Sequence, residues 1–481
     1  MVCGNRQRDV VRHRAGVISR PALAICVAFG MLGGGGVKAE DLSAALASAY
    51  RANPGLEAER ARLRASDEEV PRAKSGYRPR VTGNADAGVR HSNTNPPLRS
   101  DGKTRPRGFD VQVTQPVFRG FRTVNAVREA EANVRAARAS LRSIEQTTLL
   151  EGVTAYVDVI RDQAIVRLRQ NNVRVLSKEL RATKDRFNVG EVTRTDVAQA
   201  RARRAGAVSQ LDLAKANLRS SRAEYERVIG HPPSGLIEPQ PLDARLPRSL
   251  SEALEIAQAE NPNVISAAFL EQAARHAVDR IHGEFLPEVN LEAEYQRRYN
   301  SSRVVRDTES ASITGRVTVP LYQAGDVSAR VRQAKQTAEG RLRDIEQARV
   351  RARADVVSAW SRLISARAKL VSDRIQVSAN QTALTGVRKE EEVGQRTLLD
   401  VLDAEQELLD AQVQLAITRR DLVVASYSVL SAVGRLTAAD LSLPVAIYDN
   451  ESYYRLVREK WWGVTVTRDA GYVAETNGTA D

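Results

Sequence analysis

The chain contains the same pattern twice, and this repeat constrains its fold more than any other feature. The segment "LSAALASAYRANP" (Leu42–Pro54) returns as "LSEALEIAQAENP" (Leu250–Pro262), and "FNVGEVTRTDV" (Phe187–Val197) returns as "EEVGQRTLLDV" (Glu391–Val401). The matching segments keep their order and almost keep their spacing, as expected after duplication of a unit of about 200 residues. Any structure assigned to one half must therefore also suit the other.

Residues 1–39 have the pattern of a signal peptide. A region rich in arginine precedes a short apolar stretch, and Val37–Ala39 resembles a small-residue cleavage site. A membrane anchor is the alternative, although the apolar stretch is shorter than the ~20 residues that a helical span needs. Both cysteines, Cys3 and Cys26, lie in this segment. The mature chain is therefore expected to contain no disulfide, thiolate metal site or cysteine nucleophile.

The net charge of +13 does not indicate a nucleic-acid-binding protein. Basic residues are interspersed with acidic ones along predicted helices, and aromatic residues make up only 5% of the chain. The five histidines have no metal-ligand spacing, and there is no nucleophile motif or phosphate-binding loop. We therefore expect neither an enzyme nor a cofactor.

Two very long helices are predicted, at about 121–187 and 325–391. Small and apolar residues recur every three or four positions along the second of them, the spacing typical of a coiled-coil seam. A helix of this length extends roughly 100 Å, at 1.5 Å per residue. A compact core cannot cover it, so it needs neighbouring helices along its whole length.

Four segments alternate apolar and polar residues and are predicted to be strands, at about 79–91, 107–118, 287–299 and 311–322. Each has roughly the ten residues of a tilted strand that crosses an outer membrane. A soluble antiparallel sheet is the alternative. After the signal segment no run of 18 apolar residues occurs, so no helical span is predicted.

If the strands enter a membrane, one chain cannot complete the structure. Four strands do not close a barrel, and an open sheet edge cannot face lipid because its backbone groups would lack hydrogen-bond partners. Phe118 and Tyr322 end their strands where an interfacial aromatic residue is expected, and Gly120 and Gly325 follow at the expected bends into the helices. Several chains must then share one barrel.

This organisation, together with the turn motifs "VGEVTRTDV" and "VGQRTLLDVLDAEQEL", resembles the TolC family of outer-membrane channel-tunnels. The second motif is especially similar to the outer-membrane components of type I protein secretion. The resemblance implies an α+β membrane protein that forms a homotrimer. Four strands per chain would build a twelve-stranded barrel in outer-membrane lipid, continuous with a long periplasmic coiled-coil barrel of α-helices.

The resemblance also implies a function and partners. The channel would export substrates from an inner-membrane ABC or RND transporter, which it reaches through a periplasmic adaptor (membrane fusion protein). Type I protein secretion is the favoured system, and the outer-membrane channel of a multidrug efflux pump is the alternative. A soluble periplasmic coiled-coil scaffold or adaptor is a further alternative, which would share the long helices but lack the barrel.

The expected organisation follows from these assignments. The segments are a signal peptide (1–39), a first repeat (40–230), a linker in an equatorial belt (231–248), a second repeat (249–434) and a C-terminal equatorial segment with a tail (435–481). Trp461 and Trp462 lie in this last segment, which has no counterpart in the first repeat, and are expected to pack on the belt.

Each turn between the long helix and the next helix contains a candidate helix cap. Thr193 with Asp196, and Thr397 with Asp400, have the spacing of a capping box. This role alone accounts for Asp196 and is sufficient for Asp400. It does not account for Asp403, which lies on the same helical face as Asp400.

The resemblance suggests a second role for these turns. Asp400 and Asp403 match the acidic constriction at the periplasmic entrance of the family's channels. Arg396 matches the gate arginine, and Thr195 and Asp196 match its partners. Glu391 departs from the tyrosine of some relatives. Six turn residues are expected to dock the periplasmic adaptor: Val189, Gly190, Thr193, Val393, Gly394 and Thr397.

The two turn regions also differ in charge. The first is basic and the second is acidic, so the two helical hairpins are expected to pair side by side, although a merely solvated surface is the alternative. The basic residues are Arg186, Arg194, Arg201, Arg203 and Arg204, and the acidic ones are Glu390, Glu391, Glu392, Asp400, Asp403, Glu405 and Glu407.

Overall fold

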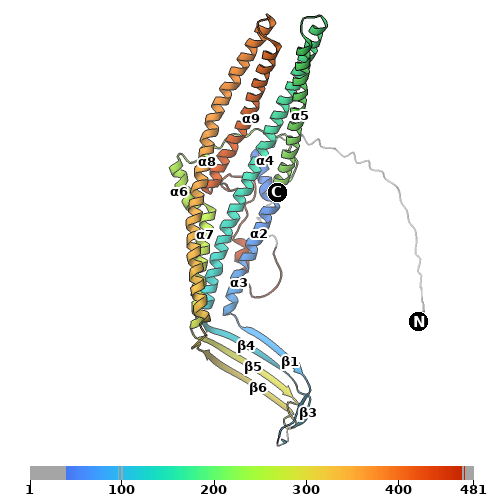
Figure 1. Ribbon diagram of the computed structural model, residues 1–481. Coiled ribbons are helices and arrows are strands. Elements are labelled where there is room, and N and C mark those ends of the chain that lie inside the picture. The colour runs from blue at the N-terminus through green and yellow to red at the C-terminus, as the bar shows by residue number, and fades with distance from the viewer. Residues whose placement is uncertain (1–39, 96, 99–100, 468–470, 472–481) are drawn as a thin grey trace, which may run out of the picture. The chain divides into compact units, whose positions relative to one another are not determined.

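A computed structural model describes residues 40–95, 97–98, 101–467 and 471. The predicted signal peptide and both cysteines lie outside the described residues. The described residues form long α-helices and one four-stranded sheet, as predicted. Figure 1 shows the sheet at one end of the helices and two hairpin tips at the other.

The helices of the two halves correspond in order, with α2 and α3 of the first half together matching α7 of the second. The first half contains α1 (Leu42–Ala52), α2 (Pro54–Asp67), α3 (Glu69–Lys74), α4 (Arg122–Asn188) and α5 (Arg194–Ile229). The second contains α6 (Leu250–Glu260), α7 (Pro262–His282), α8 (Asp326–Glu392) and α9 (Leu398–Val433), and α10 (Ser452–Val457) follows. Helices α4 and α8 each have 67 residues, and α5 and α9 each have 36.

The repeated Asn-Pro pair has the same structural role in both halves. Asn53 ends α1 and caps α2, and its side-chain oxygen accepts the N–H groups of Gly55 and Leu56. Asn261 likewise separates α6 from α7. Each proline occupies the first helical turn, where its missing N–H leaves no hydrogen bond unmade. The repeat therefore encodes a sharp break between two successive helices.

The sheet has the strand order β1-β4-β5-β6, and every neighbouring pair is antiparallel. Its strands are β1 (Arg80–Ala87), β4 (Arg107–Arg119), β5 (Glu288–Tyr299) and β6 (Asp307–Thr318). Thus each half contributes two strands, and the central pair β4–β5 joins the halves. A short hairpin, β2 (Arg90–Ser92) with β3 (Gly102–Thr104), forms part of the loop between β1 and β4.

The strand bounds differ from the expected ones at two places. The first expected strand is divided, because β1 ends at Ala87 and the next three strand residues belong to β2. The last strand begins at Asp307 and ends at Thr318, so Tyr322 lies beyond it. Pro320 has no N–H to donate to a neighbouring strand, which explains why the ladder stops before it.

The largest apolar core lies where α1, α2, α4, α5 and α9 meet the segments that connect and follow the repeats. Tyr156 of α4 is fully buried there, with its hydroxyl 2.7 Å from the carbonyl oxygen of Glu40 and 2.8 Å from that of Ile237. Tyr448, in the C-terminal segment, belongs to the same core, and its backbone N–H donates to Tyr50 Oη of α1 at 3.1 Å. The core therefore joins Glu40, the linker and the C-terminal segment to α1 and to the middle of α4.

Two glycines allow the strand–helix junctions of the two halves to cross. Gly120 lies between β4 and α4, and Gly283 lies between α7 and β5. A methyl group built on either one would lie 2.2 Å from the carbonyl oxygen of the other. Gly120 also has a φ of +58°, whereas the backbone of Gly283 is helical. The contact at Gly283 thus depends on its small size alone.

We predict that Gly283→Ala destabilises the protein, because the backbones must move apart to admit the methyl group. The expected loss is about 1–3 kcal/mol, as for other overpacked sites. Thermal unfolding followed by circular dichroism measures it. Gly315→Ala in β6 is the control, since nothing lies within 4 Å of its added methyl group. Equal unfolding temperatures for the two variants would contradict the close crossing.

Candidate functional site

The ends of the two helical hairpins form the candidate site. One tip is the turn between α4 and α5, and the other is the turn between α8 and α9 (Figure 1). Gly190 and Gly394 have φ values of +85° and +79°. In each turn the residue after the glycine donates its N–H to a carbonyl five positions earlier, Glu191 to Arg186 at 2.9 Å and Gln395 to Glu390 at 2.8 Å. These are Schellman-type helix ends, which require a left-handed residue.

The predicted capping boxes both form. Thr193 Oγ1 accepts the N–H of Asp196 at 3.3 Å, and Asp196 Oδ2 accepts the N–H of Thr193 at 2.8 Å. Thr397 and Asp400 repeat this arrangement with distances of 3.3 and 3.0 Å. The backbone N–H and hydroxyl of Thr397 hold the pKa of Asp400 below its usual range. Both aspartates therefore have a structural role at the helix starts.

The turns themselves are open to solvent. Val189 and Val393 are exposed, and nothing lies within 4 Å of a methyl group built on Gly190 or Gly394. The six residues expected to dock an adaptor thus lie at the two tips, in two matching groups of three.

Within the single chain, Arg396 does not meet its expected partners. The Nε of Arg396 donates instead to Glu390 Oε2 at 3.0 Å, within the same hairpin. Asp196 is engaged by its own capping box, and Thr195 is exposed on α5. The physical reason is local: a carboxylate and a guanidinium on either side of one tight turn meet without any movement of the other hairpin.

Two of the ion pairs that connect the hairpins lie near the tips. Arg186 Nη1 of α4 donates to Glu391 Oε1 of α8 at 2.7 Å, and the carboxylate raises the pKa of Arg186. Arg203 of α5 forms a hydrogen-bonded ion pair with Asp403 of α9. The opposite charges of the two tips predicted such pairing, but the sequence did not indicate which residues would meet. Asp403 is therefore paired within the protomer.

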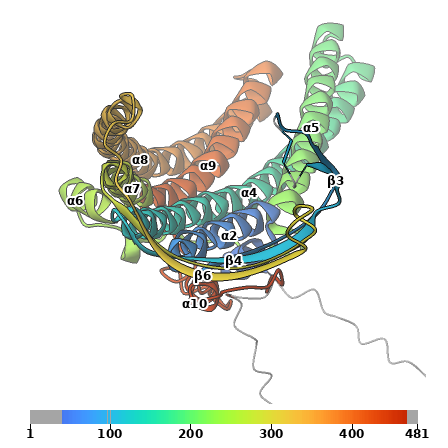
Figure 2. The same cartoon turned by 90° about the horizontal axis from the view of Figure 1, so that it is seen from below.

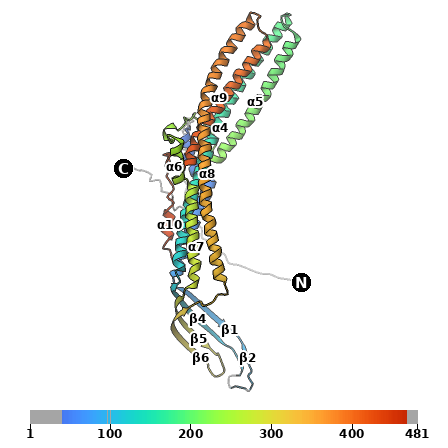
Figure 3. The same cartoon turned by 60° about the vertical axis from the view of Figure 1, so that its left-hand side comes forward.

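An apolar contact lies beside these ion pairs. Leu176 of α4, Ala207 of α5 and Leu402 of α9 form a buried cluster between the hairpins. Leu402 directly precedes Asp403, so the ion pair lies at the edge of this cluster. The views in Figures 1 and 3 agree in showing the two hairpins alongside each other.

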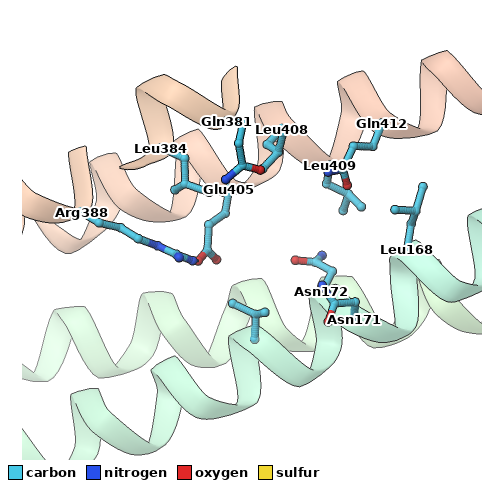
Figure 4. A pocket seen from close by; sticks show the side chains of 11 residues that line it. Leu168, Asn171, Asn172, Gln381, Leu384, Arg388, Glu405, Leu408, Leu409 and Gln412 are labelled. Carbon is cyan, nitrogen blue, oxygen red and sulfur yellow. The ribbon is translucent and has the colours of Figure 1, made fainter. Parts of the chain in front are cut away.

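A cavity of about 250 Å³ separates the hairpins farther from the tips, between α4, α8 and α9. Glu405 is 7% exposed and forms an ion pair with Arg388 through Oε1. Its Oε2 has no hydrogen-bond partner among the described residues. Burial raises the pKa of Glu405, and the Arg388 guanidinium opposes this shift. Figure 4 shows Asn172 and Glu405 pointing toward each other across the space.

Within the part of the chain that the structure describes, no group of three or more His, Cys, Asp or Glu side chains is arranged to hold a metal ion. No described helix combines the length and the apolar character that a membrane span needs. The two hairpin tips are connected by side-chain contacts, namely ion pairs and a small apolar cluster. This arrangement allows the tips to associate or to separate.

Most of the chain matches known proteins. The model of the family described as "Outer membrane efflux protein" matches residues 45–231 and 253–435, one match for each repeat. The chain is 38% identical over 451 residues to the outer membrane efflux protein BepC of Brucella suis, covering 92% of this chain and 96% of that protein. It is 26% identical over 344 residues to the alkaline protease secretion protein AprF of Pseudomonas aeruginosa, covering 70% and 71%.

Solved structures support the same fold. The outer membrane channel CmeC of Campylobacter jejuni superimposes with a TM-score of 0.75 at 15% identity, covering 82% of this chain and 86% of that one. The chain is also 24% identical to the outer membrane protein TolC of Escherichia coli, over 84% of each chain. The two family matches coincide with the two repeats found in the sequence, and this chain therefore belongs to the outer membrane efflux protein family, the TolC family, whose members are transport channels.

Proposed function

We propose that this chain is one protomer of a trimeric outer-membrane channel. The channel exports substrates that an inner-membrane transporter delivers through a periplasmic adaptor. The observation that supports an assembly of several chains is that the single chain leaves both edges of its sheet, and one face of a long helix, without a partner among the described residues. The outer edges of β1 and β6 have no paired strand among the described residues. In lipid, each unpaired backbone group costs several kcal/mol, so the edges of neighbouring chains must pair.

The long helix α8 supports the same proposal. Its predicted seam is buried within the protomer, including Val356, Ala359 and Leu363. A second apolar stripe, repeating every seven residues, is exposed on the same helix. It consists of Val350, Val357, Ile364 and Val371. A heptad stripe of this kind is typical of a helix that packs against another helix. The stripe suits the helices of a neighbouring protomer.

We predict that Ile364→Glu weakens the trimer. Ile364 is exposed in the single chain, so the substitution leaves the protomer fold intact, but in the assembly it would bury a carboxylate without a partner. The fraction of trimer after mild heating, measured by electrophoresis, should fall. Arg362→Glu is the matched control, because Arg362 is exposed two residues away and off the stripe. Equal trimer fractions would contradict a helix contact at this stripe.

For the substrate class, we propose efflux of small molecules. The relative named as an efflux protein is 38% identical and spans almost the whole chain, whereas the relative named for protease secretion is 26% identical over a shorter part. Type I protein secretion, favoured by the turn motif, is the second candidate. A strain that lacks the gene distinguishes them: efflux predicts increased drug susceptibility, and secretion predicts loss of an exported protein from the medium.

We propose further that the hairpin tips form the periplasmic entrance. Asp400 and Asp403 from three chains would bring carboxylates toward one axis, where they attract cations. Within the protomer, Arg396 pairs with Glu390 and does not reach Thr195 or Asp196. In the trimer, Arg396 would bridge to Thr195 and Asp196 of a neighbouring protomer. The ion pairs Arg186–Glu391 and Arg203–Asp403 would hold the second hairpin against the first in the closed state.

We predict that the double variant Arg186→Ser/Arg203→Ser opens the channel. Each exposed ion pair contributes roughly 0.2–1 kcal/mol, so losing two favours the open state by about 2- to 30-fold. Single-channel recording in a planar bilayer should show a higher open fraction. Arg194→Ser, at an exposed position of the same hairpin, is the control. If both variants behave like the unmodified channel, these pairs do not hold the gate.

The adaptor is proposed to dock on the turns Val189–Thr193 and Val393–Thr397. We predict that Gly190→Trp/Gly394→Trp abolishes crosslinking to the adaptor while the trimer persists. A Cβ atom added at either glycine meets no other atom within 4 Å, although the left-handed backbone adds a strain of about 1 kcal/mol at each site. Gly206→Trp in α5 is the control, since an added Cβ there also meets no atom within 4 Å and the residue lies away from the turns. Normal crosslinking of the double variant would exclude docking at the tips.

A further inference from the structure

The residues after α10 leave the equatorial core, and Gly471 lies back beside Tyr448 of that core, where its carbonyl oxygen accepts the N–H of Asp449 at 2.9 Å. Trp461 and Trp462 follow α10, and their exposed fractions are 65% and 88%. Val464 and Val466 are also exposed, at 98% and 63%. The expected packing of both tryptophans on the belt is therefore wrong. Large aromatic and β-branched side chains gathered on one exposed segment indicate that something other than the described residues covers them.

Several contacts bring this segment along the outside of the first repeat. Tyr453 Oη of α10 donates to Glu68 Oε1 at 2.7 Å, and Arg138 of α4 donates to Glu451 at 2.9 Å. After α10, Glu459 forms an ion pair with Lys74, at the end of α3. This contact lies nearer to the strands than the contacts of α10 itself. The path of the segment is thus fixed by hydrogen bonds on both sides of α10.

Arg78 then fixes the tryptophans at the base of the sheet. Its Nη1 donates to the carbonyl oxygen of Lys460 at 2.7 Å, and its guanidinium lies 4.9 Å from the ring of Trp461. Arg78 is only two residues before Arg80, where β1 begins. Lys460 Nζ also donates to the carbonyl oxygen of Thr465 at 2.8 Å, which closes the segment into a loop. The exposed loop Lys460–Val466 therefore starts where strand meets helix.

The surroundings have the composition of a membrane interface. Other aromatic residues near the strand–helix junctions are exposed: Tyr77, Phe121 and Tyr322. Basic side chains beside the loop suit the phosphates of lipid headgroups. They are Arg78 and Lys460. Tryptophan, tyrosine and basic residues concentrate at this level of membrane proteins, where an apolar ring and a polar atom are both satisfied.

The loop also lies on the appropriate side of the sheet. Figure 2 shows α10 outside the curve of the strands, on the side away from α8 and α9. If several curved sheets close into one barrel, their convex sides face outward, toward lipid. The same side carries α10 and the start of the loop. The loop is consequently on the side of the sheet that would face lipid in the proposed barrel.

We propose that the loop Lys460–Val466 is a membrane-interface anchor, with Trp461 and Trp462 in the headgroup region of the periplasmic leaflet of the outer membrane. This proposal rests on the proposed insertion of the sheet in that membrane. The anchor would fix the depth of the barrel by a contact outside the barrel strands. Each trimer would then carry three such loops around its base.

Tryptophan fluorescence tests the proposal directly, because the chain has only three tryptophans. In the full-length variant Trp360→Phe, emission comes from Trp461 and Trp462 alone. The reconstituted trimer is placed in vesicles whose phospholipids carry bromine atoms near the headgroup end of the acyl chain. We expect the emission to fall roughly twofold relative to unbrominated vesicles, because interfacial tryptophans lie at the headgroup level. Bromines at the chain terminus should quench less.

The control is Trp461→Phe/Trp462→Phe, which retains Trp360 in α8. Its emission should be insensitive to either lipid. Trp360 packs against apolar residues, so Trp360→Phe could prevent folding. In that case, the difference in bromine quenching between the unmodified protein and the control gives the quenching of Trp461 and Trp462.

Single-channel conductance and heat-modifiable trimer migration in the same vesicles report insertion independently. Failure of insertion would contradict the proposed function itself. An inserted, conducting trimer without quenching would overturn the anchor alone. A blue-shifted emission without quenching would show that a neighbouring protomer covers the tryptophans, which also overturns it.

Discussion

The rest of the structure depends on the unpaired edges of one four-stranded sheet. An antiparallel sheet with both edges open is stable only where water or another strand satisfies its backbone groups. This requirement determines how the rest of the chain is arranged. The sheet ends in helices of 67 residues that expose further apolar positions, and these helices also need neighbours. Strand edges and helix faces thus both require a neighbouring chain, and the proposed assembly of several chains would supply one.

Gene duplication accounts for the two similar helical hairpins of one chain. The Asn-Pro breaks, the left-handed turns and the capping boxes recur at equivalent positions, so the two hairpins have the same geometry. Their charges have diverged. The first tip contributes Arg186 and Arg203, and the second contributes Glu391 and Asp403. Equal geometry with opposite charge allows the two hairpins of one chain to lie side by side.

The strength of the contacts changes along the molecule. Around Tyr156 the side chains are fully buried, and hydrogen bonds hold Glu40 and Tyr448 in place. Toward the tips, the links are exposed ion pairs and a small apolar cluster, next to a cavity that contains the half-paired Glu405. Exposed ion pairs contribute little individually. Motion is therefore expected at the tips, where the proposed gate lies, rather than in the middle.

The sequence alone determined the features that depend on residues close together in the chain. Periods of two and of three to four residues predicted the strands and long helices, and the spacing of Thr193 and Asp196 predicted a capping box. Only the tertiary structure decided features that depend on helix rotation and chain path. These are the pairing of Arg203 with Asp403, the crossing of Gly120 and Gly283, and the position of Trp461 beside Arg78. Local hydrogen bonds are set by spacing along the chain, whereas contacts between distant segments are set by packing, which no local pattern specifies.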